Sequence, residues 1–274
     1  MRNHLLTLFL LCISATLYGQ QQANLYELAD PTTMKSRATL DLESYFFQAG
    51  EQFYALRFGF VYGLQNERHS LGISIPFVHN IFTQDYAGFE NTTGIGDLKM
   101  IYTGVPYSNK NGLGVSKVTT YFEATAPTGE SRLGRGAGTW LYKPGVIFSI
   151  KPAPEIGFYP EIKFQFSGQP ANSQGGGDGL PDPEDPEKDG TMQNLFISLP
   201  AVLVIDSWDG WFSLNAQYIR SFTEGTNFFF LRMDLGKMLG SRTGASLNIT
   251  KFIAGQPRLN VVVQAKFQFL LGSQ

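Results

Sequence analysis

An alternation of apolar and polar residues with a period of two runs through most of this chain. In the segment 259–271, apolar residues alternate with Gln264, Lys266 and Gln268. Successive side chains of a β-strand point to opposite faces, so this pattern predicts strands with one apolar and one polar face. The alternation therefore indicates an all-β chain, and it assigns each side chain to one of the two faces of its strand.

The same pattern predicts about twelve strands of roughly ten residues each, the length that a tilted strand needs to cross a bilayer. The expected strands are 37–48, 53–62, 70–79, 95–104, 115–126, 139–150, 157–166, 192–205, 211–223, 228–239, 245–254 and 259–271. The predicted fold is a transmembrane, antiparallel, up-and-down β-barrel.

Composition favours a membrane barrel over a soluble β-sandwich. Hydrophobic residues make up 43% of the 274 residues and charged residues only 16%, against a usual charged share of about 25%. After residue 20 no run of about 18 apolar residues occurs, so no transmembrane helix is expected. In a bilayer only helices and closed barrels satisfy every backbone group. A net charge of −2 gives no reason to expect a nucleic-acid partner.

The lengths of the connections sort onto the two ends of such a barrel. The three longest, 80–94, 127–138 and 167–191, are all at one end when successive connections are assigned alternately. Bacterial barrels have long extracellular loops and short periplasmic turns. We therefore expect 167–191 to be a long extracellular loop and both termini of the barrel to be periplasmic.

The first 20 residues are expected to be a signal peptide that is cleaved on export. Arg2 and His4 precede an apolar run from Leu5 to Leu17, which is short for a membrane anchor. The next segment, 21–36, is polar and irregular, and we expect it to be periplasmic and disordered rather than to plug the barrel. Residues 37–274 form the barrel, and the chain is expected in the outer membrane of a Gram-negative bacterium, in contact with its lipid.

Polar residues share one parity within several strands, and this parity predicts which residues line the lumen. A Lys or Arg that faces lipid at the bilayer midplane costs about 2–4 kcal/mol, so we expect these side chains to face inward. The predicted lumen residues are Asp41, Glu43, Lys99, Lys117, Tyr121, Glu123, Glu161, Lys163, Arg232, Asp234 and Lys266. The residues expected to face lipid include Val118, Phe122, Ile162, Phe164, Phe267 and Phe269.

Aromatic residues gather near the expected strand ends. Membrane barrels carry aromatic girdles at both interfaces with water. The residues assigned to such girdles include Tyr45, Phe53, Trp140, Tyr159, Trp208, Trp211 and Phe230.

No pattern of catalytic residues is found, so the chain is not expected to be an enzyme or to carry a cofactor. Its two histidines after the signal peptide, His69 and His79, form no His-x-Ser pair, and a pairing of His79 with Asp85 is weak support for hydrolysis. The acidic segment 167–190 is expected to be a solvated loop. The alternative is a weak Ca²⁺ site. Its candidate ligands are Asp178, Asp182, Glu184 and Asp185.

Two glycine-rich stretches resemble a known family. Residues 93–98 read TGIGDL, and residues 126–130 read APTGE, followed by GRGAG at 134–138. In order and spacing, residues 40–270 resemble the outer-membrane transporters of the MetA-pathway of phenol degradation family. The resemblance implies a porin-like channel for small, often hydrophobic or aromatic, compounds, without catalytic residues.

The sequence leaves two functions open. The first is transport, the passive passage of small solutes through the barrel. The alternative is a structural or interaction barrel that conducts nothing and presents its extracellular loops to a partner. Alternation and loop lengths do not separate these, because a filled barrel and an open one have the same strand pattern.

Overall fold

The computed structural model describes residues 24–48, 50–64, 67–81, 91–109, 115–168, 192–255 and 259–272. Within these ranges nearly all regular structure is antiparallel β. The strands are β1 (Arg37–Phe47), β2 (Gln52–Gly63), β3 (His69–Ile81), β4 (Thr92–Ile95), β5 (Leu98–Ser108), β6 (Val115–Ala126), β7 (Leu141–Ala153), β8 (Ile156–Phe158), β9 (Glu161–Ser167), β10 (Gln193–Ile205), β11 (Gly210–Ser221), β12 (Asn227–Met238), β13 (Thr243–Gly255) and β14 (Leu259–Leu270). Short 3-10 helices lie at Ser131–Leu133 (η2) and Asp206–Trp208 (η3), and residues 24–29 are α-helical.

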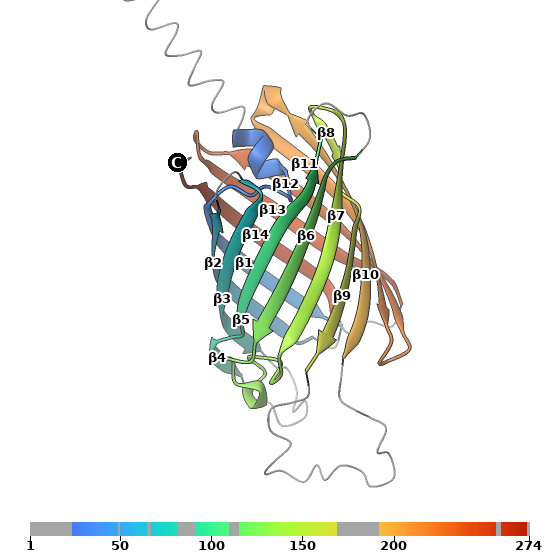
Figure 1. Cartoon of the computed structure of the whole chain (residues 1–274). Coiled ribbons are helices and arrows are strands. Elements are labelled where there is room, and N and C mark those ends of the chain that lie inside the picture. Colours follow the sequence, from blue (N-terminus) through green and yellow to red (C-terminus); the bar gives the residue numbers. More distant parts are fainter. Residues whose placement is uncertain are drawn as a thin grey trace, which may run out of the picture.

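The strands close into a 12-stranded barrel in which each strand pairs with its neighbours in the chain (Figure 1). β1 closes the barrel by pairing with β14 over eleven residues, from Arg37 opposite Leu270 to Phe47 opposite Leu259. Closure leaves no free strand edge, so the backbone groups of the wall bond within the wall. The predicted barrel of about twelve strands is confirmed.

Two positions in the barrel are occupied by two short strands each, where the sequence predicted one. β8 and β9 both pair with β7 and β10, and the break between them falls at Tyr159 and Pro160. Proline cannot donate a backbone hydrogen bond, which explains the interruption. β4 and β5 both pair with β3, and the break falls at Gly96 and Asp97.

The strand ends that the three longest connections join lie at one end of the barrel, as the connection lengths predicted. The gaps between strands at 82–91, 127–140 and 168–192 alternate with the short turns at 64–68, 154–155, 206–209 and 239–242. We call the first the long-loop end. Helical residues 24–29 and the end of β14 lie at the opposite end (Figure 1), which we call the plug end. The expected loop 167–191 itself falls almost wholly outside the described residues.

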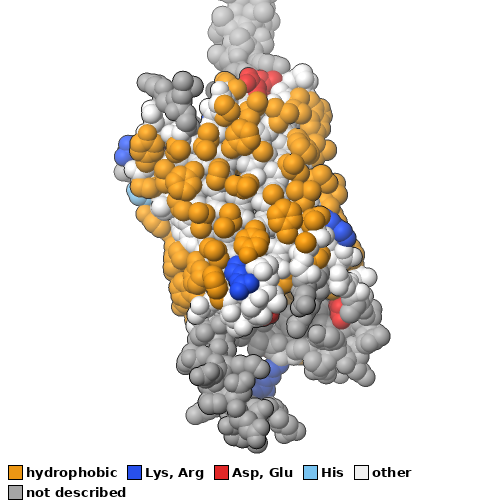
Figure 2. Space-filling view, turned by 90° about the vertical axis from the view of Figure 1, so that its right-hand side faces the viewer, with side chains coloured by type: hydrophobic (Ala, Val, Ile, Leu, Met, Phe, Trp, Pro, Cys, Tyr) orange, Lys and Arg blue, Asp and Glu red, His pale blue; other side chains and the backbone are white. Residues whose placement is uncertain are grey.

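The outer wall is apolar. Figure 2 shows hydrophobic side chains across the barrel wall and few charges between its ends. Phe122, Ile162 and Phe269 are among the large apolar residues that the wall exposes. Such a surface would be unfavourable in water and suits a hydrocarbon environment. No helix among the described residues is long and apolar enough to span a membrane.

Several aromatic residues expected in the interfacial girdles instead point into the barrel. The Tyr45 hydroxyl donates to Glu43, and the ring of Tyr45 packs edge-on against Phe53 at 5.1 Å. Phe230 packs in the same way against Phe252 at 5.5 Å. Parity places these four rings on the inner wall near the long-loop end, so position near a strand end did not suffice to predict the face.

Substitution of a lipid-facing residue in the middle of the strand position that β8 and β9 share tests this fold. Ile162 is 47% exposed on the outer wall. Ile162→Arg should destabilise the barrel by about 2–4 kcal/mol, because the guanidinium would face hydrocarbon. Ile162→Val is the matched control and should cost about 1 kcal/mol or less. Urea unfolding in lipid vesicles measures both, and equal stability of the two variants would contradict the outward assignment of Ile162.

Candidate functional site

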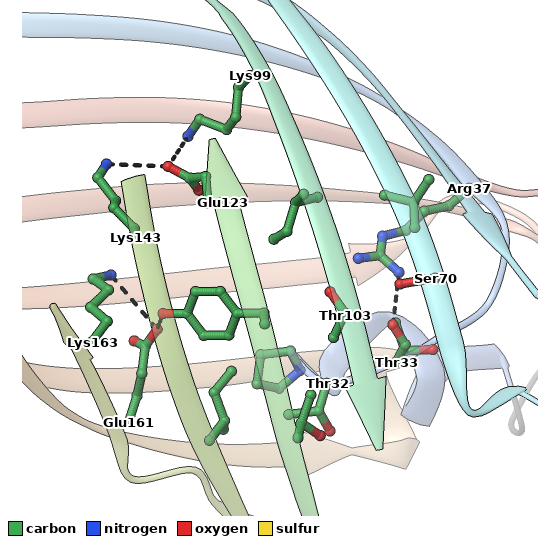
Figure 3. A pocket seen from close by; sticks show the side chains of 16 residues that line it. Thr32, Thr33, Arg37, Ser70, Lys99, Thr103, Glu123, Lys143, Glu161 and Lys163 are labelled. Carbon is green, nitrogen blue, oxygen red and sulfur yellow. Dashed lines mark hydrogen bonds and ion pairs between the residues drawn. The ribbon is translucent and has the colours of Figure 1, made fainter. Parts of the chain in front are cut away.

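The inner wall carries a belt of charged side chains, which point inward because they occupy alternate positions of their strands. One group lies on β5, β6, β7 and β9 (Figure 3). Glu123 lies 3.4 Å from the Lys99 ammonium and 3.2 Å from that of Lys143. Glu161 accepts a hydrogen bond from Tyr121 and lies 3.7 Å from Lys163. Because these carboxylates are largely removed from water, the ion pairs offset part of the cost of their burial.

A second charged group lies on the opposite part of the wall, on β1, β2, β12 and β14. Asp41 is paired in register with Lys266 on β14 and with Arg57 on β2. Glu43 accepts bonds of 3.2 and 3.3 Å from the Arg57 guanidinium, which satisfies both of its oxygens. Neighbouring strand β12 contributes Arg232 and Asp234.

The N-terminal segment fills the plug end of the barrel, contrary to the expectation that it is disordered. Leu25, Leu28 and Ala29 are almost fully buried. They belong to one apolar cluster with wall residues of β10 to β14 and with Tyr159; its other members are Val202, Val204, Trp211, Met238 and Leu270. Burial of each leucine contributes about 2 kcal/mol. This also explains why Tyr159 and Trp211 pack inside the barrel and not in a girdle. We call residues 24–36 the plug.

Polar contacts hold the part of the plug that follows its helix in the chain, and Asp30 is at their centre. One oxygen of its carboxylate accepts from the backbone N–H and the hydroxyl of Thr32, at 2.8 and 2.6 Å. The other lies 2.7 Å from the Lys151 ammonium and 3.9 Å from that of Lys117. Lys117 also donates to the Thr32 carbonyl at 2.9 Å. The predicted lumen residue Lys117 thus binds the plug.

The barrel wall makes room for the plug with two glycines. A Cβ atom at Gly63 would lie 2.2 Å from the Met34 carbonyl oxygen, and one at Gly244 would lie 2.9 Å from Leu28. Real Cβ atoms do not approach other atoms so closely. The Gly63 N–H also donates to the Ser36 hydroxyl at 2.9 Å. The close approach of plug and wall is therefore built into the sequence of β2 and β13.

Two interior cavities lie beside the plug. The first, of about 320 Å³, is lined by Pro31 to Thr33 of the plug and by β2, β3, β5, β6, β7 and β9. The second, of about 300 Å³, is lined by the plug and by β7 and β9 to β14. Both include Arg37, Ile147 and Glu161 in their linings. The interior is therefore polar and incompletely filled.

The predicted lumen residues fall into four places. Lys99, Tyr121, Glu123, Glu161 and Lys163 line the first cavity. Glu161 also lines the second, with Arg232, Asp234 and Lys266. Asp41 and Glu43 are buried among the charges of β1 and β2, and Lys117 is bonded to the plug.

Sequence reasoning missed several interior charges. Lys143 stands opposite Glu123 in the register of β6 and β7, and Arg57 stands opposite Asp41. Parity together with the charge of the cross-strand neighbour could have found both. Asp30, Arg37 and Lys151 gave no such signal, because they meet only through the folded plug.

The glycine-rich motifs form a clamp at the long-loop end. One oxygen of Asp97 accepts from the Gly129 N–H at 2.9 Å, and the other accepts from the Ala137 N–H at 2.7 Å. Asn80 donates to the Gly134 carbonyl at 2.8 Å. A Cβ at Gly129 or Gly136 would collide with Arg135 or Asp97. The motifs thus tie the loop 127–138 to the ends of β3 and β5.

The histidines show no catalytic arrangement. His69 forms a 2.8 Å hydrogen bond with Tyr102, and His79 forms one of 2.7 Å with Thr93. Asp85 lies outside the described residues, as do Asp178, Asp182, Glu184 and Asp185. Within the described ranges no group of three or more His, Cys, Asp or Glu side chains is arranged to hold a metal ion.

Comparison with known proteins places the fold. No family model and no curated protein matches the chain in sequence. In structure it is similar to the COG4313 outer membrane channel from Pseudomonas putida F1, with a TM-score of 0.67, 11% identity, and coverage of 86% of this chain and 95% of the other. It is also similar to the KdgM porin, with a TM-score of 0.55, 6% identity, and coverage of 85% of this chain and 99% of the other. For the beta domain of the Bordetella autotransporter BrkA the TM-score is 0.51, the identity is 12%, and 86% of this chain and 99% of the other are covered.

At these identities the likeness shows the fold alone. A similar fold is found in proteins named as channels or porins and in one named as an autotransporter domain. Function must therefore be argued from the lumen of this chain.

The plug is expected to depend on the charge of Asp30. Burial alone would raise the pKa of this carboxyl, but Lys117, Lys151 and the bond from Thr32 outweigh burial and hold it below its usual 3.8. A depressed pKa stabilises the folded state above pH 3.8, and that stabilisation is lost as the pH falls through the lowered value. The protection of residues 24–36 against hydrogen exchange, relative to the unfolded chain at the same pH, should thus persist at pH 5 and fall only below about pH 4.

Asp30→Asn should accelerate this exchange at neutral pH, because the partly buried Lys117 and the exposed Lys151 lose their carboxylate, at a local cost of about 1–3 kcal/mol. Glu155→Gln, at the turn between β7 and β8, is the charge-matched control at the same end. Unchanged exchange of the plug in Asp30→Asn would contradict the role of this ion pair.

The loop clamp gives an independent prediction. Asp97→Ala leaves the Gly129 and Ala137 amides without their carboxylate acceptor, at a cost of about 1.5–3 kcal/mol for each bond to a charged group. Exchange of these two amides should accelerate while the plug stays protected. If the loop 127–138 exchanged as in the parent protein, the clamp would not hold it.

Proposed function

We propose that this protein is an outer-membrane channel of a Gram-negative bacterium, through which small solutes pass passively. The observation that carries the proposal is a closed 12-stranded barrel with an apolar outer wall and a charged inner wall around two cavities. A barrel that served only as a scaffold would gain stability from a packed, apolar interior. Charged side chains around open space suit the passage of a hydrated or polar solute.

The structural neighbours support this proposal. The COG4313 protein is named an outer membrane channel, and KdgM is named a porin. Export by a signal peptide, cleaved near residue 20, belongs to the same proposal, because the first 23 residues lie outside the described ranges. The proposal also includes the orientation of the barrel in the membrane: the long-loop end is extracellular and the plug end is periplasmic.

The lining favours solutes with a polar part. The family resemblance implies hydrophobic or aromatic compounds, and the rings of Tyr45, Phe53, Phe230 and Phe252 offer apolar contact near the long-loop end. Beyond them every route along the lumen meets the charged belt. We therefore propose small amphiphilic or polar solutes, aromatic ones included.

Passage past the plug end requires that the plug move. Its helix packs on β10 to β14, while Thr32 and Asp30 contact Ser149 and Lys151 of β7 on the other side. The plug thus spans the mouth and holds the barrel closed at that end. Displacement of residues 24–36 would join the two cavities to the periplasm.

The alternative function, a barrel that conducts nothing and presents its loops to a partner, is favoured by the same plug. A mouth filled by an apolar cluster and by ion pairs is stable without a solute. The two functions differ in whether displacement of the plug opens a path.

Conductance in planar bilayers distinguishes them. Gly63→Ala places a Cβ against the Met34 carbonyl and should displace the plug, raising the open probability several-fold. Gly240→Ala is the matched control, because no described atom lies within 4 Å of a Cβ at that position. It should conduct as the parent does.

A disulfide provides the reverse test. The hydroxyl oxygens of Thr32 and Ser149 are 3.2 Å apart, close enough for Thr32→Cys and Ser149→Cys to bond, with Cys12→Ser as background. Oxidation should lower conductance and reduction should restore it, while each single cysteine variant should be insensitive. Absence of conductance in the parent, in Gly63→Ala and in the reduced double variant would establish the non-conducting alternative instead.

A further inference from the structure

The lining of the first cavity contains more cations than carboxylates. Its lining contains four cations, Arg37, Lys99, Lys143 and Lys163, and two carboxylates, Glu123 and Glu161. Glu123 is shared between Lys99 and Lys143, and Glu161 lies near Lys163. The formal balance is thus +2. We call this cavity the cationic chamber.

The excess distinguishes this chamber from the neighbouring cavity, although Arg37 and Glu161 line both. The neighbouring cavity is of nearly the same size, about 300 Å³ against 320 Å³. Its lining contains three cations, Arg37, Arg232 and Lys266, and three carboxylates, Asp30, Glu161 and Asp234, so its formal balance is zero. Two cavities in one barrel therefore differ in charge and hardly in volume.

A hydroxyl group without a partner marks the same place. Thr119 is 1% exposed, it lines the cationic chamber, and its Oγ1 has no hydrogen-bond partner among the described residues. A buried hydroxyl that bonds to nothing is unfavourable. The hydroxyl of Thr119 is therefore placed to donate to an acceptor bound in the chamber.

From these observations we propose that the cationic chamber binds a small organic dianion with two carboxylates. Two negative charges restore the balance of the lining, and lysine and arginine side chains are strong donors to carboxylates. A cavity of about 320 Å³ accommodates a small molecule. The proposal rests on the proposed channel function. It names the solute class of the channel, and it places the binding site of that solute in the chamber.

The binding test uses succinate as the probe, with the full protein folded in detergent at low ionic strength. Succinamide is the neutral control of similar size, and putrescine is the dication. Isothermal titration should show saturable binding of succinate, with succinamide at least tenfold weaker and no binding of putrescine. Succinate binding should weaken as salt is added, because the attraction is electrostatic.

Two variants locate the site. Lys143→Gln removes one cation while Glu123 keeps its contact with Lys99, so the fold should survive. It should weaken succinate binding roughly tenfold, as expected for the loss of a charge-assisted bond. Thr119→Val removes only the hydroxyl, and it should weaken binding several-fold without lowering barrel stability. Lys251→Gln, whose ammonium bonds Asn260 near the long-loop end, changes the total charge equally and should leave binding unchanged.

Equal binding of succinate and succinamide, or equal weakening by Lys143→Gln and Lys251→Gln, would overturn the dianion site. The planar-bilayer experiment keeps this outcome separate from channel function. Conductance without selective succinate binding would leave the channel and remove the site. Succinate binding sensitive to Lys143→Gln in a barrel that never conducts would leave the site and remove the channel.

Discussion

Backbone hydrogen bonding around a closed wall is the constraint on which the rest of this structure depends. In hydrocarbon an unbonded N–H or C=O group costs several kcal/mol, so the wall must close on itself through β1 and β14. Closure fixes two faces with a strict period of two. Apolar side chains take most of the outer face, and the charges of the belt are directed inward, where they meet other charges.

The ion pairs of the interior form because these charged side chains lie close together on the inner wall. Glu123 lies between two lysines, and Glu43 accepts two bonds from one arginine. Such pairs roughly offset the cost of burying their charges and add little net stability. They do fix the positions of long side chains, and this keeps space open between them. The number of strands sets the width of the lumen, and side chains that bond along the inner wall leave it incompletely filled, as the two cavities show.

Strand number, the ends of most strands and the sorting of long and short connections followed from the sequence, because each depends on local alternation. The break at Asp97 did not follow from the sequence, because it depends on the Gly129 amide, 32 residues further along the chain. The break at Pro160 was missed as well. The plug was only the less favoured alternative, because disorder was expected for this segment. Its residues 24–36 show no alternation, and their partners lie on β7 and on β10 to β14, so no local pattern records the contact. Asp30 is an ordinary acidic residue until Lys117 and Lys151 approach it in space.

The place of the plug in the chain determines when it can form. It precedes β1 directly, yet its apolar surface packs on residues of β10, β11, β12 and β14, from Val202 to Leu270. The pairing of β14 with β1 brings these strands next to the segment that precedes β1. The complete packing surface for the N-terminal segment therefore exists only in the closed barrel. An unfinished barrel leaves Leu25 and Leu28 exposed, so the order of this short segment reports whether assembly is complete.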